Sequence, residues 1–104
     1  MTRVAFRMRL KPGCEAEYRA RHDAIWPELV DVLRAGGTRN YSIFRSDLDL
    51  FAYLELDEDA GIREASASVH PVLQRWWEMM APLMECNADQ SPVTWPLEEV
   101  FHLD

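Results

Sequence analysis

The feature that most constrains the fold is a change in the spacing of apolar residues near the amino terminus. Between Arg3 and Leu10, polar and apolar residues alternate, so that Val4, Phe6 and Met8 point to one side. A period of two predicts a β-strand with one buried face. After a Pro-Gly turn the spacing becomes that of a helix. The chain therefore begins as a strand followed directly by a helix.

The helical pattern runs from about Cys14 to Arg34 and carries a histidine among apolar side chains. At about 3.6 residues per turn, the histidine and the apolar side chains share one inward face of the helix. Pro27 interrupts the pattern because it lacks a backbone N–H, so the helix either kinks or restarts near Trp26. Gly36-Gly37 is expected to end it in a left-handed cap. The inward face carries Cys14, Tyr18, His22, Ile25, Leu29 and Leu33.

The remaining chain shows strand and helix patterns separated by polar turns. The predicted elements, in order, are strands over Asn40–Phe44 and Leu50–Leu56, a weak helix at about Ala60–Ser68, a third helix with Leu73, Trp76, Trp77, Met80, Leu83 and Met84 on one face, a loop from Cys86 to Pro96, and a strand over Glu98–Leu103.

This order of elements matches the split βαβ, ferredoxin-like arrangement of the α+β class. It predicts an antiparallel sheet with helices on one face. The 104 residues show no repeat or linker, so we expect one domain over residues 1–104. A sheet covered on one side leaves its other face free, and 48% of the residues are hydrophobic. We therefore expect a homodimer.

Charge and cysteine content exclude several classes of protein. A formal net charge of -7 argues against nonspecific nucleic-acid binding and against binding to anionic membranes, since both need a positive face. Cys14 and Cys86 lack the close spacing of a zinc or redox site, and we expect free thiols in a reducing compartment. The sequence has no signal-peptide core and no span long enough to cross a bilayer, which predicts a cytoplasmic protein.

Three histidines are candidates for acid-base chemistry. His22 is the strongest, because its imidazole titrates near neutral pH and faces the interior, one turn from the Tyr18 hydroxyl. The alternative is a core histidine whose hydrogen bonds are satisfied. His70 precedes a proline at a helix start and is expected to cap it or lie at the surface, and His102 is expected to be structural. No metal-ligand spacing and no Gly-rich phosphate loop occurs, so we expect neither a metal nor a cofactor.

Aromatic residues suggest the class of ligand. Trp76 and Trp77 are adjacent on one helix, about 100° apart, so both cannot occupy the centre of one core contact. Tyr18 and Tyr41 lie in other elements. Rings with a broad apolar surface and a hydrogen-bonding tip suit a ligand with apolar C–H faces and many hydroxyl groups. The alternative is that these are large core residues.

Several short blocks occur in a recognisable order: Tyr18 to His22, Ile25 to Leu29, Asn40-Tyr41, Gln74 to Trp77, Ser91 to Val93 and Glu99 to Phe101. In these blocks the chain resembles the L-rhamnose mutarotase family over essentially its whole length. The resemblance implies a dimeric α+β barrel of the ferredoxin-like kind and interconversion of the α and β anomers of L-rhamnose without a cofactor. It also implies that His22 is the proton donor and that Tyr18, Tyr41, Trp76 and Trp77 bind the sugar.

Two other functions fit the same fold. A small dimeric α+β-barrel monooxygenase acting on a quinol or with haem would also place a histidine and aromatic residues in a cavity. A non-catalytic sugar or metabolite sensor would bind a ligand without accelerating any reaction. Colour, haem binding or oxygen consumption would favour the first, and binding with no effect of His22→Ala on any rate would favour the second.

Overall fold

We describe the structure, a computed structural model, over residues 1–58 and 70–104. The weak helix predicted at about residues 60–68 lies outside the described residues. The elements in chain order are β1 (Thr2–Arg9), α1 (Glu15–Asp23), α2 (Pro27–Ala35), β2 (Thr38–Ser46), β3 (Asp49–Leu56), α4 (Pro71–Met80), the 3₁₀ turn η1 (Ala81–Leu83) and β4 (Trp95–Leu97).

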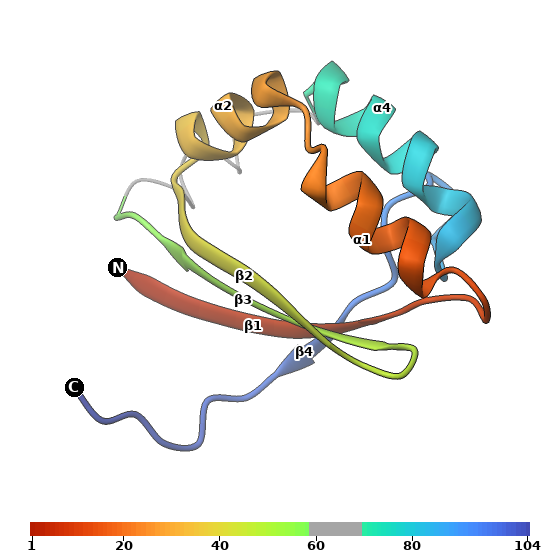
Figure 1. Ribbon diagram of the computed structural model, residues 1–104. Helices are drawn as coiled ribbons and strands as arrows, with labels where there is room; N and C mark the ends of the chain where they lie inside the picture. The colour runs from red at the N-terminus through yellow and green to blue at the C-terminus, as the bar shows by residue number, and fades with distance from the viewer. Residues whose placement is uncertain (59–69) are drawn as a thin grey trace.

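The strands form one antiparallel sheet in the order β2-β3-β1-β4. β1 pairs along its length with β3, from Thr2 opposite Leu56 to Arg9 opposite Asp49. Helices α1, α2 and α4 all lie on the same side of this sheet (Figure 1). This is the ferredoxin-like arrangement, and it confirms the predicted α+β class with helices on one face.

The core lies between the helices and the covered face of the sheet. Met8 and Leu10 are 4% and 1% exposed, as the alternation in the first strand predicts. Their neighbours Leu50 and Ala52 on β3 are also buried, and α2 adds Leu29. The helical stripe predicted from Leu73 to Met84 is confirmed in part: Trp76 and Met80 are buried on α4, and Leu73 and Trp77 are partly buried. Leu83 and Met84 are buried too, but they lie in η1 and after it, because the α-helix ends at Met80.

The helical region predicted from residue 14 to 34 consists of two helices. α1 ends at Asp23, and Trp26 has an extended backbone with φ -64° and ψ 127°. Pro27 then occupies the first turn of α2, where its missing N–H leaves no hydrogen bond unmade. Gly37, with φ 97°, provides the predicted left-handed termination. Two short helices at an angle, rather than one straight helix, thus cover the sheet (Figure 1).

The predicted strand over Glu98–Leu103 is wrong, because the last strand, β4, is Trp95–Leu97. Leu97 pairs with Ala5, so three more antiparallel pairs would bring the strand to the first residue of β1. A strand continuing to residue 103 would have no partner there. The loop predicted up to residue 96 is correspondingly shorter.

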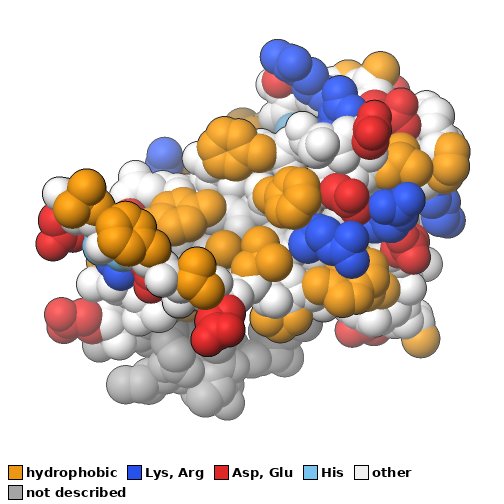
Figure 2. All heavy atoms as spheres, turned by 90° about the horizontal axis from the view of Figure 1, so that it is seen from below, with side chains coloured by type: hydrophobic (Ala, Val, Ile, Leu, Met, Phe, Trp, Pro, Cys, Tyr) orange, Lys and Arg blue, Asp and Glu red, His pale blue; other side chains and the backbone are white. Residues whose placement is uncertain are grey.

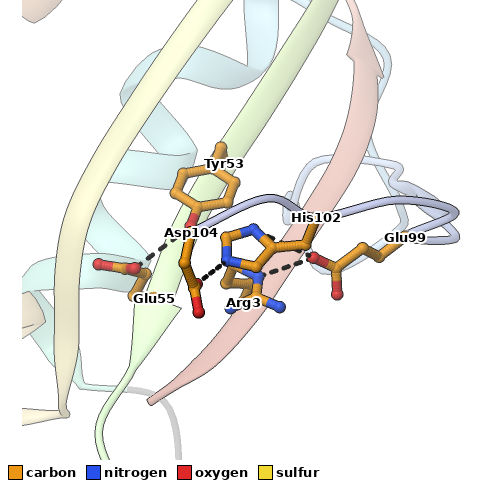
Figure 3. A network of polar contacts seen from close by, with 6 residues as sticks. All are labelled: Arg3, Tyr53, Glu55, Glu99, His102 and Asp104. Carbon is orange, nitrogen blue, oxygen red and sulfur yellow. Dashed lines mark hydrogen bonds and ion pairs between the residues drawn. The ribbon is translucent and has the colours of Figure 1, made fainter.

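Polar contacts at the surface hold the segment that follows β4 (Figure 3). Arg3 Nε donates a hydrogen bond to Glu99 at 2.7 Å, and His102 Nε2 lies 2.6 Å from Asp104 Oδ1. On the neighbouring strand, the Tyr53 hydroxyl donates to a Glu55 carboxylate oxygen at 3.2 Å. Because these groups are exposed to water, each contact stabilises the fold by little. His102 therefore lies at the surface and contacts the carboxylates of Glu99 and Asp104.

The face of the sheet opposite the helices, which we call the open face, is partly apolar. Figure 2 views the molecule from this side and shows hydrophobic side chains gathered between charged ones. Arg7 lies over the ring of Trp95 at 4.4 Å, and both Arg7 and Arg9 pair with Asp49. Large apolar side chains remain exposed on and beside this face: Phe44, Phe51, Leu97, Val100, Phe101 and Leu103.

Three further findings concern the helices and the cysteines. His70 Nδ1 accepts a hydrogen bond from the backbone N–H of Val72 at 3.1 Å, which confirms the predicted capping role. Cys14 and Cys86 are free thiols. Within residues 1–58 and 70–104, no helix has both the length and the apolarity needed to cross a membrane.

The core predicts a large difference between two leucines. Leu50→Ala should lower the free energy of unfolding by about 2–5 kcal/mol, because it removes buried methyl groups and leaves a cavity. Leu103→Ala makes the same chemical change at a residue that is 80% exposed, and it should have almost no effect. Urea unfolding followed by circular dichroism measures both. Equal destabilisation would contradict the assigned core.

Candidate active site

A cavity of about 520 Å³ lies between the helices and the covered face of the sheet. Its volume is within the range of small-molecule sites. All five residues predicted to form a site line this cavity. They come from different elements: Tyr18 and His22 from α1, Tyr41 from β2, and Trp76 and Trp77 from α4. The fold thus collects side chains that are far apart in the sequence.

His22 lies in the last turn of α1, with its imidazole among aromatic rings. The centroid of its ring is 4.3 Å from that of Tyr18, and it meets Trp76 edge to face at 5.4 Å. The imidazole is thus neither enclosed in solid core nor directed into bulk solvent. It faces a cavity large enough for a ligand.

One nitrogen of the His22 ring is already occupied. Nδ1 lies 3.0 Å from the backbone oxygen of Tyr18, which can only accept a hydrogen bond. Nδ1 therefore carries a proton, and Nε2 is the nitrogen available for proton transfer. Burial lowers the pKa of His22, while the bond to the Tyr18 carbonyl raises it by less. The ring is therefore mostly neutral at pH 7.

The two tyrosines provide hydroxyl groups that remain protonated at neutral pH. Burial is the main cause that raises the pKa of Tyr18, and the nearby Tyr41 adds to it. Although 38% of Tyr41 is exposed, the surrounding protein raises its pKa to about 12 by desolvation. Neutral phenols can both donate and accept hydrogen bonds, which suits recognition of sugar hydroxyls.

A β-bulge precedes Tyr41 on β2. Arg39 pairs with Glu55 but Ser42 pairs with Tyr53, so Asn40 and Tyr41 together face one residue of β3. Asn40 adopts a left-handed backbone with φ 50°, which asparagine tolerates better than most residues, and its side-chain amide donates to Glu55. As expected from the alternation, Tyr41 lies on the covered side with Ile43.

The tryptophans differ in burial. Trp76 is only 7% exposed, whereas Trp77 is half-buried, and both reach the cavity. Trp26, which sequence analysis did not include in the site, packs edge to face on Trp76 at 5.2 Å. It thus supports the wall of the cavity from behind.

Sequence analysis also missed the polar end of the cavity, which we call the polar rim. Arg39 Nη1 donates to the backbone oxygens of Arg34 and Thr38, and its other guanidinium nitrogen pairs with Asp57. No periodic pattern marks these residues, although asparagine is one of the residues that tolerate a left-handed backbone. The polar rim consists of Arg34, Thr38, Arg39 and Asn40.

The site contains no arrangement of metal ligands. Across the described ranges 1–58 and 70–104, no group of three or more His, Cys, Asp or Glu side chains is placed to hold a metal ion. His70 and His102 do not line the cavity. The chemistry that the arrangement offers is proton transfer by one imidazole and two phenols, next to apolar walls that can contact a ring.

Comparison with known proteins identifies the relatives of the chain. A family model described as L-rhamnose mutarotase matches residues 3–103. The L-rhamnose mutarotase of Leptothrix cholodnii is 49% identical over 102 residues, covering 98% of this chain and 96% of that protein. The protein of the same name from Sinorhizobium fredii is 50% identical over 105 residues, covering 99% of each.

Solved structures agree with the sequence matches. The crystal structure of an L-rhamnose mutarotase from Formosa agariphila superposes with a TM-score of 0.88 at 39% identity, covering 100% of both chains. Tetracenomycin F2 cyclase from Streptomyces glaucescens superposes with a TM-score of 0.60 at 20% identity, again over both whole chains. The second similarity concerns the fold alone.

The environment of His22 predicts its titration. Its NMR midpoint should lie below the reference value of 6.5, because burial disfavours the charged ring. Below about pH 6.5 the unfolded chain then binds more protons than the native one, so the contribution of His22 to the free energy of unfolding declines as the pH falls. Imidazole proton signals measured against pH, assigned by their loss in His22→Ala, provide the test. A midpoint above 6.5 would contradict the described burial.

Proposed function

Because the chain belongs to the L-rhamnose mutarotase family, we propose that the cavity is where the sugar ring opens and closes, with His22 transferring the proton. The protein is an isomerase that interconverts the α and β anomers of L-rhamnose. The observation that carries the site assignment is the His22 ring in a cavity walled by aromatic rings, with Nδ1 held by the Tyr18 carbonyl so that Nε2 is the nitrogen left for proton transfer.

Mutarotation needs two proton transfers and no other chemistry. The ring opens when the ring oxygen gains a proton and the anomeric hydroxyl loses one, which gives the open-chain aldehyde. Rotation about the bond between C1 and C2 then exposes the other face of the carbonyl, and the reverse transfers close the ring. The overall reaction involves no redox change and no net gain or loss of a proton.

His22 is proposed to protonate the ring oxygen through Nε2 and to recover the proton on closure. The hydrogen bond from Nδ1 to the Tyr18 carbonyl leaves Nε2 free for both steps. A lowered pKa makes the protonated ring a stronger acid, although less of it is present at neutral pH. The Tyr18 hydroxyl, or a water molecule, is proposed to relay the second proton, because a neutral phenol can accept one proton while giving up another.

Tyr41, Trp76 and Trp77, with Tyr18, are proposed to bind the sugar. Aromatic faces pack against the C–H groups of a sugar ring, and phenol and indole tips hydrogen-bond to its hydroxyls. All four residues line the same cavity as His22. Their sharing of one cavity with His22 supports this role.

Replacing His22 tests the assignment. His22→Ala should reduce the enzymatic rate of anomer exchange by about 10²–10⁴-fold, because positioned acid-base catalysis contributes that much. NMR exchange spectroscopy on L-rhamnose, corrected for the spontaneous rate, measures the enzymatic rate of anomer exchange. The circular dichroism of the variant should be unchanged. A folded variant with a near-normal rate would refute the role of His22.

Two further variants separate binding from catalysis within this test. Tyr41→Phe and Trp76→Ala should mainly raise the KM and weaken saturation-transfer signals, since they remove contacts to the sugar rather than the transferred proton. If they lowered kcat as much as His22→Ala does, the division of roles would be wrong.

The comparisons do not favour the monooxygenase alternative, because the family model and the full-length relatives are mutarotases. A sensor would bind sugar with no enzymatic acceleration, so the rate of the unmodified protein distinguishes it. We also propose that residues 1–104 form a single domain and that the protein acts in the cytoplasm.

The open face is proposed to pair with a second copy of the chain as a homodimer. Phe44 is 65% exposed and Leu97 is 44% exposed on this face, and such apolar surface is uncommon on a monomer. Arg7, Arg9 and Asp49 form ion pairs on the same face, so a partner surface must carry charges complementary to theirs.

The oligomeric state is directly measurable. Light scattering after gel filtration at micromolar concentration should give twice the 12.1 kDa chain mass. Phe44→Asp should shift the distribution toward monomer, because it places a charge in an apolar interface. Ala20→Asp adds the same charge at an exposed position of α1, on the other side of the sheet, and should retain the dimer. A monomer for the unmodified protein at this concentration would contradict the proposal.

A further inference from the structure

The two ends of the cavity differ in chemistry, and we infer that its apolar end receives the C6 methyl group of the 6-deoxy sugar. This inference rests on the proposed function. Three methionines, Met8, Met80 and Met84, line the apolar end, and we call them the methionine floor. Their exposures are 4%, 3% and 2%, so their side chains are packed into the core where they meet the cavity.

The methionine floor and the polar rim lie at different levels of the sheet. Arg39 on β2 pairs with Glu55, which in turn pairs with Arg3. Met8 is five residues farther along β1 than Arg3, which is about 16 Å at 3.3 Å per residue. In Figure 1, the connection from α2 to β2 and the carboxyl end of α4 likewise lie toward opposite ends of the sheet.

His22 lies beside the wall that joins these two ends. Its ring contacts Trp76, and Met80 is one helical turn farther along the same buried side of α4. A ring oxygen held at Nε2 of His22 is therefore close to the residue that begins the methionine floor. At the other end of the cavity, Tyr41 directly follows Asn40 of the polar rim along β2.

The polarity of the sugar matches this arrangement in one orientation. In L-rhamnose the methyl group is attached to C5, next to the ring oxygen, whereas the C2 and C3 hydroxyls lie on the far edge of the ring. Directing those hydroxyls to the polar rim directs the methyl group to the methionine floor. The opposite orientation would place hydroxyls against thioether side chains, which are poor hydrogen-bond acceptors.

The floor also distinguishes a methyl from a hydroxymethyl group. Among the buried side chains of the described residues, the only hydroxyl belongs to Tyr18. The thioether sulfurs of the floor are weak acceptors and cannot donate, so a C6 hydroxyl there would lose water without gaining a strong hydrogen bond from the floor. Methionine side chains are flexible and unbranched, so they can close around a methyl group.

Three sugars that differ only at C6 test this inference on the unmodified full chain. L-mannose has a C6 hydroxyl, L-lyxose lacks C6, and both otherwise share the configuration of L-rhamnose. Relative to L-rhamnose, kcat/KM for anomer exchange should fall at least about 10-fold with L-lyxose and about 10²-fold with L-mannose. Equal values for the three sugars would overturn the inference while leaving mutarotation intact. Failure to accelerate all three would instead overturn the proposed function.

A pair of variants locates the preference. Met80→Gln should reduce the ratio of kcat/KM for L-rhamnose to kcat/KM for L-mannose at least about 10-fold, since the amide can hydrogen-bond to the C6 hydroxyl. Met79→Gln is the matched control, because Met79 adjoins Met80 on α4 but does not line the cavity, and its ratio should match that of the unmodified protein. An unchanged ratio in folded Met80→Gln would overturn the inference.

A measurement on the unmodified protein covers the case in which Met80→Gln does not fold. In saturation-transfer NMR with L-rhamnose, the C6 methyl protons should receive the strongest signal, because they lie closest to protein protons. Stronger transfer to the C2 and C3 protons than to the methyl group would place the methyl group in solvent and overturn the inference.

Discussion

The break in the helix before Pro27 is the constraint on which the site depends. Pro27 has no N–H to continue the hydrogen bonding of α1, so α1 ends one residue after His22 and α2 starts in a new direction. Two helices rather than one then lie over the sheet, and side chains from both line the cavity. Trp26, in the extended segment between them, packs on Trp76 and connects this break to the wall of α4.

Sequence periodicity predicted the architecture well where one face of an element is buried. The first strand, the α4 stripe and the Gly37 termination follow from side-chain alternation, helical spacing and the backbone freedom of glycine. The final strand was placed three residues too late, because strand length depends on the partner available in the sheet. That information lies in β1, at the other end of the chain.

The sequence predicted five residues that line the cavity, but it did not predict the shape of the cavity. His22 stood out because a titratable ring on an apolar stripe is uncommon, and the tyrosines and paired tryptophans stood out as aromatic residues. The family resemblance supplied the sugar-binding role expected of them. The polar rim and the bulge at Asn40 depend on strand register, which no local pattern specifies. The buried methionines read as ordinary core residues, because burial looks the same in the sequence whether or not a cavity adjoins it.

The pairing of β1 with β4 has a consequence for how the chain folds. Arg7 and Trp95 are partners, so this edge of the sheet joins the two ends of the molecule. The hairpin of β2 and β3, by contrast, needs only a short turn. Loop-closure entropy delays contacts between residues that are distant in the sequence. We therefore expect the β2–β3 hairpin to form early in refolding and the pairing of β4 with β1 to form last. Emerging from the ribosome, the chain cannot complete its sheet until Leu97 has been synthesised.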